Sequence, residues 1–430
     1  MKHIPEKLLH FIWKNQLFER KGLKTTSGET IVIEHPGEHH SDAGPDFFNA
    51  RIRIDKTQWA GNIEIHVNAS DWIKHGHQKD KAYDNVILHV VHFYDCEITD
   101  SCNNIIPALV LPCPDKLINT YEDLISSEKW VACQDHIQSI PPVHINQWIS
   151  SLMIERLHEK HLRMKALLDK TKNDWEQMLF VALLSCFGIP LNQLPFEMLA
   201  DSVDIRNILR IKEDLFKTEA MLFGAAGFLT ANLPSDYYSE SLLKEYRALK
   251  LRIEKEEIPY HLWKFLRLRP GSFPSLRLAL LASLIHFKFP LTEAIAKVKT
   301  KKDLYNILRT RASDYWNTHY LFGKTSPSRI KYTGKTFLDI LIINAIIPYL
   351  FTLGKLRDHA EKIELAIKIL EEVSVEKNET IKNWCKFGVN AKNAFESQAL
   401  IQLYNMYCKQ RRCLNCQIGI KIIAPMPHEG

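Results

Sequence analysis

The sequence contains no uninterrupted apolar run of the roughly 18 to 20 residues that a membrane-spanning helix needs. The most apolar stretch, residues 337–353, is interrupted by Asp339, Asn344 and Pro348. The first residues, Met-Lys-His-Ile-Pro-Glu, carry charge and proline where a secretory signal peptide has an apolar core. These absences predict a cytoplasmic protein that does not enter a membrane.

Cysteines are too few and too scattered for a disulfide framework. There are nine, an odd number, and most stand singly in apolar surroundings, as Cys186 does. Small secreted domains built on disulfides instead carry an even number of cysteines at close spacing. The pattern predicts reduced thiols, in agreement with a cytoplasmic location.

Several nucleotide-binding and hydrolytic motifs are also absent. Residues 323–325 and 334–336 both read Gly-Lys-Thr, but the first glycine of a phosphate-binding loop is replaced by Thr318 and Arg329. The patterns G-x-G-x-x-G, G-x-S-x-G and H-E-x-x-H do not occur. The sequence therefore does not predict a P-loop NTPase, a dinucleotide-dependent oxidoreductase, an α/β-hydrolase or a zincin.

Length and composition indicate an ordinary folded protein with more than one domain. The chain has 430 residues, of which 46% are hydrophobic and 25% charged, so it has enough apolar side chains for two or more cores. The formal net charge is +6. This excess is compatible with a polyanionic partner such as nucleic acid, and equally with a solvated surface.

The pattern of the chain changes near residue 115. Before it, a helical segment at residues 6–18 is followed by short β-rich runs separated by turn residues. After residue 140 nearly every segment has helical spacing, without a regular repeat. We therefore predict an α+β fold, with an α/β module at 1–115, a linker at 116–140 and a large irregular helical domain at 141–430. The expected strands are 29–34, 47–54, 62–67, 86–93 and 106–111, and the expected helices include 148–168, 175–187, 205–229, 239–254, 337–353, 360–372 and 391–409.

Two carboxylates and a histidine lie on adjacent predicted strands. Asp46 follows Pro45 at the start of one strand, and Glu64 and His66 lie on the next, where alternation points both side chains to the same face. Mg²⁺ and Mn²⁺ prefer oxygen ligands from one or two carboxylates. We expect Asp46 and Glu64 to bind such a metal, with the Ile65 carbonyl as a third ligand.

This arrangement resembles the half-motifs of the PD-(D/E)XK nuclease superfamily. There, a helix carrying a glutamate precedes three strands, an aspartate opens the second strand, the D/E-x-K motif lies on the third, and a helix and a fourth strand follow. The resemblance implies a metal-dependent nuclease in which Glu6, or alternatively Glu19, is the helix-borne carboxylate. His66 stands in the place of the usual lysine, where a neutral imidazole can act as general base or bind Zn²⁺ or Mn²⁺.

Histidines are concentrated around this motif. Eight of the 19 lie between Glu34 and His92, which is far more than an even spread. On a helix, His77, Asp80 and Tyr83 would share a face. A polar surface explains any one of these histidines, but the density predicts a pocket that collects several of them, with His77 as a further metal ligand.

A second candidate metal site lies near the carboxyl end. Cys408, Cys413 and Cys416 form a C-x4-C-x2-C pattern, and Cys385 is the candidate for a fourth thiolate. Four thiolates suit a tetrahedral Zn²⁺ ion or an iron–sulfur cluster. The alternative is a group of reduced thiols without metal.

Taken as a whole, the chain also resembles an uncharacterised bacterial domain-of-unknown-function family. The matching stretches include His-Ser-Asp-Ala-Gly-Pro-Asp-Phe (40–47), Gly-Asn-Ile-Glu-Ile-His-Val (61–67), Glu-Ala-Met-Leu-Phe-Gly-Ala-Ala-Gly (219–227) and the final cysteines. This resemblance implies no activity. The residues favour a metal-dependent nuclease or phosphodiesterase. The alternatives are a non-catalytic nucleic-acid-binding or scaffold protein with a degenerate nuclease core, and an interaction protein stabilised by zinc or an iron–sulfur cluster.

Overall fold

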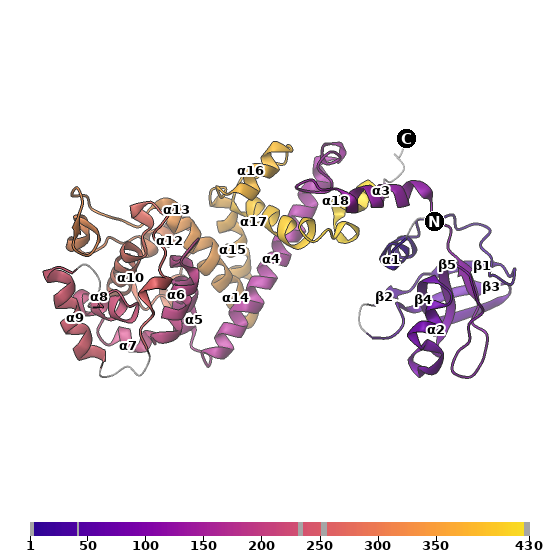
Figure 1. Cartoon of the computed structure of the whole chain (residues 1–430), viewed down its shortest axis with the longest axis horizontal. Coiled ribbons are helices and arrows are strands. Elements are labelled where there is room, and N and C mark those ends of the chain that lie inside the picture. The colour runs from indigo at the N-terminus through magenta and orange to yellow at the C-terminus, as the bar shows by residue number, and fades with distance from the viewer. Residues whose placement is uncertain (1–3, 41–42, 231–234, 251–255, 425–430) are drawn as a thin grey trace. The chain divides into compact units, whose positions relative to one another are not determined.

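The computed structural model describes residues 4–40, 43–230, 235–250 and 256–424. The chain forms two compact units, one of residues 1–148 with 403–430 and one of residues 149–402 (Figure 1). The strands of the main sheet lie in the first unit, and the second is largely helical. This combination confirms the predicted α+β class.

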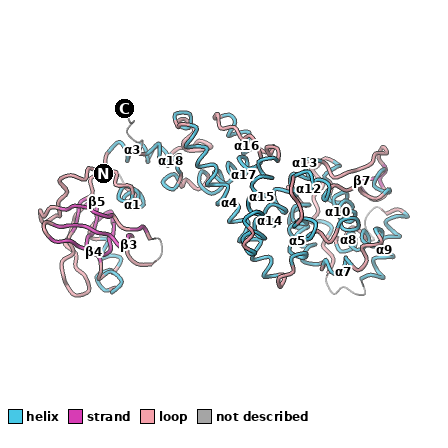
Figure 2. The backbone as a smooth tube through the Cα atoms, turned by 180° about the vertical axis from the view of Figure 1, so that it is seen from behind, coloured by secondary structure: helices cyan, strands magenta, loops and turns pink. Residues whose placement is uncertain are grey.

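The first unit contains a mixed sheet of six strands, drawn in magenta in Figure 2. The sheet order is β1-β3-β4-β5-β6, with β2 paired to β3. The pairs among β1, β2, β3 and β4 are antiparallel, whereas β4, β5 and β6 are parallel. The strands are β1 (Ile31–His35), β2 (Glu38–His39), β3 (Phe47–Ile54), β4 (Thr57–Asn68), β5 (Val86–Phe93) and β6 (Ala108–Val110).

Burial follows the position of each strand in the sheet. On β3 buried and more exposed residues largely alternate, as expected for a strand with one covered face. Residues 61–66 of β4 and 86–91 of β5 are all buried, because these are the central strands and helices pack against β4. Helix α1 (Glu6–Lys14) contributes a stripe of buried apolar side chains: Leu8, Leu9, Phe11, Ile12 and Trp13.

The crossover from β4 to β5 contains α2 (Asp71–His75) and the 3₁₀ turns η1 (His77–Lys79) and η2 (Lys81–Tyr83). The expectation that His77, Asp80 and Tyr83 share one helix is therefore wrong. Gly76 ends α2 in the left-handed conformation (φ 79°), and Asp80 is extended and caps η2. The rings of His77 and Tyr83 nevertheless stack, with centroids 3.8 Å apart.

The first unit also includes segments beyond the sheet. Much of residues 116–140, expected as a linker, is occupied by α3 (Asp115–Ser126) and η3 (Ile137–Ser139). The carboxyl-terminal segment, assigned from sequence to the helical domain, groups with the first unit. It contains a π-helical stretch η8 (Leu403–Cys408), a 3₁₀ turn η9 (Cys413–Asn415) and α18 (Gln417–Ile423).

The second unit is an irregular array of helices with one small hairpin. The long helix α4 (Pro142–Lys170) begins just before the boundary between the units. The other elements are α5 (Trp175–Phe187), α6 (Gln193–Ser202), α7 (Ile205–Leu209), α8 (Leu215–Ala225), α9 (Tyr237–Lys250), α10 (Pro274–Lys288), α11 (Thr292–Ala296), α12 (Lys301–Leu308), β7 (His319–Leu321), β8 (Lys324–Thr325), α13 (Lys335–Leu341), the π-helical η7 (Ile342–Ile346), α14 (Ile347–Arg357), α15 (Ala360–Glu372), α16 (Glu379–Lys386) and α17 (Ala394–Gln402), with 3₁₀ turns at η4 (Tyr260–Leu262), η5 (Pro270–Ser272) and η6 (Asp314–Asn317).

Some helices have the bounds that the sequence pattern predicts, and others do not. Helices α5 and α15 have the predicted bounds. The helix expected over residues 205–229 is instead split into α7 and α8, because Asp204 and Asp214 each cap a separate helix. Of the helix expected over 239–254, α9 ends at Lys250, and residues 251–255 lie outside the described part of the chain.

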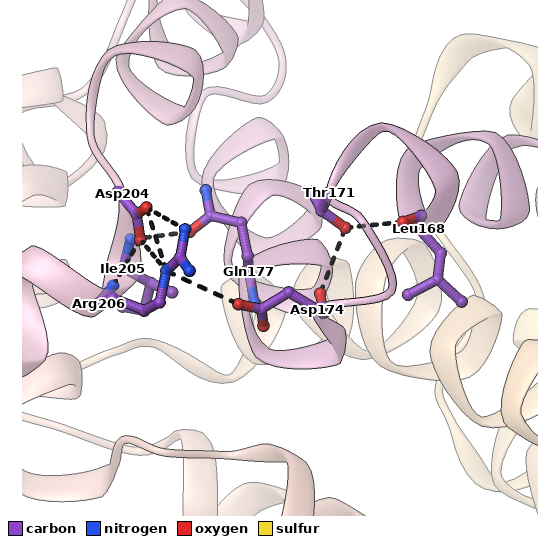
Figure 3. Close-up of polar contacts among 7 residues, drawn as sticks. All are labelled: Leu168, Thr171, Asp174, Gln177, Asp204, Ile205 and Arg206. Carbon is purple, nitrogen blue, oxygen red and sulfur yellow. Dashed lines mark hydrogen bonds and ion pairs between the residues drawn. The ribbon is translucent and has the colours of Figure 1, made fainter.

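Polar side chains join the end of α4 to α5 and α7 (Figure 3). Asp174 caps α5 by accepting the Gln177 N–H at 2.9 Å. The Gln177 side chain in turn accepts the Ile205 N–H at 2.7 Å, and Arg206 forms an ion pair with Asp204. The free donors at the starts of both helices are thereby satisfied within one small network.

Among the described residues, one helical stretch is long and apolar enough to cross a membrane by length and composition. It spans Lys335–Arg357, and 78% of its apolar window is buried inside the protein. Its side chains, including Ile342, Ile346 and Leu350, form part of the core of the second unit.

Candidate functional site: carboxylates and imidazoles on β3, β4 and α2

The register of β3 and β4 brings Asp46 and Glu64 together. Asp46 immediately precedes β3, whose Phe47 is paired with Ile63 on β4. The Asp46 N–H donates to Glu64 Oε2 at 3.0 Å, and the Ile65 N–H donates to Asp46 Oδ2 at 3.0 Å. The two predicted carboxylates therefore lie side by side.

His66 lies at the centre of a group of imidazoles. Its Nε2 is 3.5 Å from Glu64 Oε1 and 3.1 Å from His75 Nδ1. Its Nδ1 is 2.9 Å from Nε2 of His89, which lies on the neighbouring strand β5 opposite Glu64. Only 1% of the His66 surface is exposed, so its ring orientation is set by these partners.

The crossover after β4 adds His75 and His77. Asp71 fixes the start of α2, because its carboxylate accepts the Asn68 N–H at 3.0 Å. His75 is the last residue of α2, and Gly76 turns the chain so that His77 Nε2 comes within 3.4 Å of Glu64 Oε1. Ligand atoms of His66, His75 and His77 all lie within 4.8 Å of one another.

Helix α1 completes the site with His10 and Glu6. His10 Nε2 lies 3.2 Å from Asp46 Oδ2. Glu6, one turn earlier on α1, interacts electrostatically with His10, Asp46 and His75. Glu19, the alternative to Glu6, is exposed and lies outside α1.

The environment keeps the central imidazoles uncharged. Burial, followed by the neighbouring histidines, lowers the pKa of His66 to about 2, and burial lowers that of His89 to about 3. Burial also lowers the pKa of His77. Neutral imidazoles retain the lone pair that a metal ion requires.

The pKa values of Glu64, Glu6 and His10 shift in the opposite direction. Burial and then the charge of Asp46 raise the pKa of Glu64. Burial alone would lower the pKa of His10, but contact with Asp46 and the charges of Asp46 and Glu6 outweigh it and raise the pKa. Burial is also the main cause of the raised pKa of Glu6. Positive charge placed in this site would therefore stabilise ionised carboxylates.

The donor set has the chemistry of a transition-metal site. Ligand nitrogens of His66, His75 and His77 lie within 4.8 Å of one another, and Glu64 Oε1 lies 3.5 Å from His66 Nε2 and 3.4 Å from His77 Nε2. Zn²⁺, Mn²⁺ and Fe²⁺ accept mixed nitrogen and oxygen ligands, whereas Mg²⁺ prefers oxygen alone. The contact of His66 Nδ1 with Nε2 of His89 at 2.9 Å sets the orientation of the His66 ring. The residues present fit a divalent transition metal.

Sequence reasoning found part of this site. The structure brings Asp46, Glu64, His66, His77 and Glu6 together. It adds His10, His75 and His89, which were not predicted as site residues. The density of histidines was the available signal for His75 and His89, and the spacing of Glu6 and His10 by one helical turn was the signal for His10.

The cysteines of the second candidate metal site fall in both units. Cys408, Cys413 and Cys416 belong to the first unit, but Cys385 lies on α16 of the second unit and is exposed. The fourth cysteine near the other three is Cys133, whose thiol influences the ionisation of Cys408. Cys133 follows α3, and its distance in sequence hides this proximity.

Comparison with known proteins identifies the family of the chain. No curated protein and no solved structure matches it. A family model described as "Protein of unknown function (DUF2851)" matches residues 6–379, which includes both the carboxylate–imidazole site and most of the helical unit. The chain belongs to this family, DUF2851.

Proposed function

We propose that this protein is a metal-dependent phosphodiesterase that acts on nucleic acid. The observation that carries the proposal is the convergence of Asp46 and Glu64 with the imidazoles of His66, His75 and His77. Carboxylates and neutral imidazoles at this spacing are the ligands of hydrolytic metal sites. The element order also supports it, because a helix, antiparallel strands, a crossover helix and a further strand are what the PD-(D/E)XK resemblance implies.

The ligands favour Mn²⁺ or Zn²⁺ over Mg²⁺, because nitrogen outnumbers oxygen among the facing donors. His66, His75, His77 and Glu64 would hold the ion. A bound divalent ion supplies a water of lowered pKa and neutralises charge on the phosphate.

The remaining residues have separate roles in the proposed reaction. Asp46 fixes the carboxylate of Glu64 through its backbone N–H, and its own carboxylate holds His10. His10, whose pKa is raised, carries a proton at a higher pH than an isolated histidine, and in this proposal it donates that proton to the leaving oxygen. His89 orients His66.

A basic cavity beside the site supports a polyanionic substrate. His10 lines a cavity of about 590 Å³ whose other lining residues include Lys7, Lys14, Arg411 and Arg412. Positive side chains grouped beside a hydrolytic site attract phosphate backbones and raise their local concentration. Phosphodiester substrates therefore fit this surface better than neutral esters do.

The test is cleavage of end-labelled single- and double-stranded DNA and RNA with Mn²⁺, Zn²⁺ or Mg²⁺. We expect cleavage with Mn²⁺ or Zn²⁺, and a loss of about 100-fold or more in the double variant Asp46→Asn, Glu64→Gln, whose amide oxygens still accept the local hydrogen bonds. Glu34→Gln is the matched control, because Glu34 is an exposed carboxylate on β1.

Two outcomes would overturn the proposal. One is equal cleavage by the double variant and the native protein. The other is salt-dependent retention of nucleic acid without turnover under any of these metals, which would favour the alternative of a non-catalytic nucleic-acid-binding protein.

A further inference from the structure

The basic cavity beside the carboxylate–imidazole site has no acidic side chain among the described residues that line it. Its cations are Lys7, Lys14, Arg411 and Arg412. None of the four forms an ion pair with another described residue. A cavity of similar size in the second unit, about 560 Å³, instead pairs its Lys170 with Asp201 at 2.7 Å. Because like charges around one cavity repel each other, the arrangement in the first unit favours a bound anion.

Helix α1 forms one wall of the basic cavity. Lys7, His10 and Lys14 are spaced by three or four residues, so their side chains lie along one face of the helix. The apolar side chains of α1 are buried, and their packing fixes this face in place. Both lysines are exposed and therefore remain available to a ligand.

The carboxyl-terminal loop supplies the two arginines of the basic cavity. The Arg411 guanidinium donates through Nη2 to the carbonyl oxygens of Ser127 and Lys129, the latter at 3.2 Å. Its Nη1 is buried and has no hydrogen-bond partner. The exposed Arg412 side chain reaches the Met406 carbonyl oxygen only at 3.5 Å. One guanidinium is thus held in position, and both retain donors that the protein does not use.

The neutral residues of the lining favour phosphate over bases as the group that is recognised. Phe11 and Tyr121 line the cavity, but they are only 6% and 3% exposed, so neither ring offers a face for base stacking. Amide side chains add hydrogen-bond donors beside the cations, and they come from Asn15, Gln410, Asn415 and Gln417. Donors and positive charge without a stacking surface bind phosphate oxygens irrespective of sequence.

The size and charge of the basic cavity favour the end of a strand. Its volume of about 590 Å³ is that of a pocket for one small ligand, such as a nucleotide with its phosphate, and is too small for two paired strands. A terminal phosphate monoester carries about 1.5 to 2 negative charges at pH 7, whereas each internal phosphodiester carries one. Four cations around one confined space therefore gain most from a terminal phosphate.

His10 connects the basic cavity to the proposed hydrolytic site. It lines the cavity, and its Nε2 lies 3.2 Å from Asp46 Oδ2. The Asp46 N–H in turn donates to Glu64 Oε2 at 3.0 Å. Successive phosphates of a strand are joined through a single sugar, so a terminal phosphate in the cavity leaves the adjoining phosphodiester near these carboxylates.

We propose that the basic cavity binds the terminal phosphate of a single nucleic-acid strand. This inference rests on the proposed function and names its substrate, because an enzyme that holds a terminal phosphate beside its hydrolytic site acts at strand ends. The group recognised is the phosphate monoester, at whichever end of the strand carries it.

The test measures binding without turnover, by fluorescence anisotropy of the full chain in EDTA. Three short single strands of one sequence carry the fluorophore on an internal base and end in hydroxyls only, in a 5′-phosphate or in a 3′-phosphate. We expect one phosphorylated strand to bind about 10-fold more tightly than the hydroxyl strand, which is about what one additional charge-assisted hydrogen bond contributes. The strand that shows the effect identifies the end that enters the cavity.

Single-charge variants assign the preference to the basic cavity. Lys14→Gln and Arg412→Gln should each reduce it to about 3-fold or less, because each removes a cation from the lining. Lys56→Gln is the matched control, since it removes the same charge from the exposed turn between β3 and β4 and should keep the preference. Circular dichroism of the three variants checks that they are folded.

Three binding results would overturn the proposal. The first is equal affinity of the native protein for all three strands. The second is an equal loss of preference in Lys56→Gln and Lys14→Gln. The third is full displacement of the phosphorylated strand by an equal concentration of a nucleoside monophosphate, which would assign the cavity to free nucleotides.

Cleavage of circular and linear single strands separates this proposal from the proposed function. Cleavage of the phosphorylated linear strand alone supports both. Equal cleavage of the circular strand would contradict recognition of ends and leave the hydrolytic assignment intact. Phosphate-dependent binding without cleavage under any metal would contradict the hydrolytic assignment and still support a terminal phosphate as the ligand of the cavity.

Discussion

His66 occupies a position where a lysine would behave very differently. A protonated lysine has no lone pair, so it can contact phosphate or water but cannot bind a metal ion. The His66 imidazole is kept neutral by burial and by its histidine neighbours, and it lies beside Glu64 and His75. Under the proposed function, a histidine at this position favours a nitrogen-rich transition-metal site over oxygen-based magnesium chemistry.

The second unit contains a buried carboxyl group whose effect on stability is measurable. Burial is the main cause that raises the pKa of Glu219 from 4.5 to about 7, although Tyr238 and Ser313 donate to its oxygens. The folded chain therefore binds this proton more tightly than the unfolded chain. This proton stabilises the folded state fully below pH 4.5, and the stabilisation is lost as the pH rises through about 7. The free energy of unfolding falls by about 3 kcal/mol over this range.

We predict that Glu219→Gln removes this pH dependence. Between about pH 5 and pH 8, the free energy of unfolding of the native protein should fall relative to that of the variant by about 3 kcal/mol. Urea denaturation at several pH values measures the difference. Glu364→Gln, at an exposed position on α15, is the control and should follow the native protein; parallel curves for all three proteins would contradict the prediction.

At the scale of elements, the β4–α2–β5 crossover supplies much of the carboxylate–imidazole site. Strand β4 supplies Glu64 and His66, α2 and the turn after Gly76 supply His75 and His77, and β5 supplies His89. The site therefore depends on where one short helix ends.

In the second unit, the side chain of Asp174 caps the start of helix α5. Asp174→Ala removes the acceptor for the Gln177 N–H and should lower the free energy of unfolding by about 1 kcal/mol. Asp169→Ala makes the same change of charge at an exposed position near the end of α4, where an acidic residue is not a cap. Equal destabilisation by both substitutions in urea denaturation would show that the cap contributes nothing.

The sequence predicted those elements whose signals are local. Asp46 and Glu64 could be paired because β3 and β4 are neighbouring antiparallel strands, so their register fixes which residues meet. The helix expected over residues 337–353 is present, but the π-helical η7 interrupts it. There the Ile343 carbonyl accepts from Lys160 of α4, a tertiary contact that no local pattern contains. His10 and His75 were missed for the same reason, since helix docking decides their neighbours.

At the scale of the whole molecule, the carboxyl-terminal segment of the chain is part of the same compact unit as the amino-terminal segment. Residues 403–430 group with residues 1–148, and Tyr404 and Tyr407 contact Trp130 and Trp148. Cys133 therefore lies in the same unit as Cys408, Cys413 and Cys416. Spacing alone pointed to Cys385 because sequence patterns favour ligands that are close along the chain.

We predict that truncation after residue 402 loosens the first unit. Removal of Tyr404, Tyr407 and Arg411 takes away packing partners of residues 115–148. Amide hydrogen exchange followed by mass spectrometry should show faster exchange in that segment, while the interior of the second unit keeps its protection. Unchanged exchange over 115–148 would mean that the carboxyl-terminal segment does not stabilise the first unit.

The central claim is that the carboxylate–imidazole site binds a divalent transition metal for hydrolysis, and anomalous diffraction tests it most directly. Crystals soaked with Mn²⁺ or Zn²⁺ should show an anomalous peak bounded by His66 Nε2, His75 Nδ1, His77 Nε2 and Glu64 Oε1, at about 2.0 to 2.2 Å from the ligand atoms. His75→Ala should weaken or abolish that peak. Well-ordered crystals that show no peak among these atoms with the metal in excess would contradict the account.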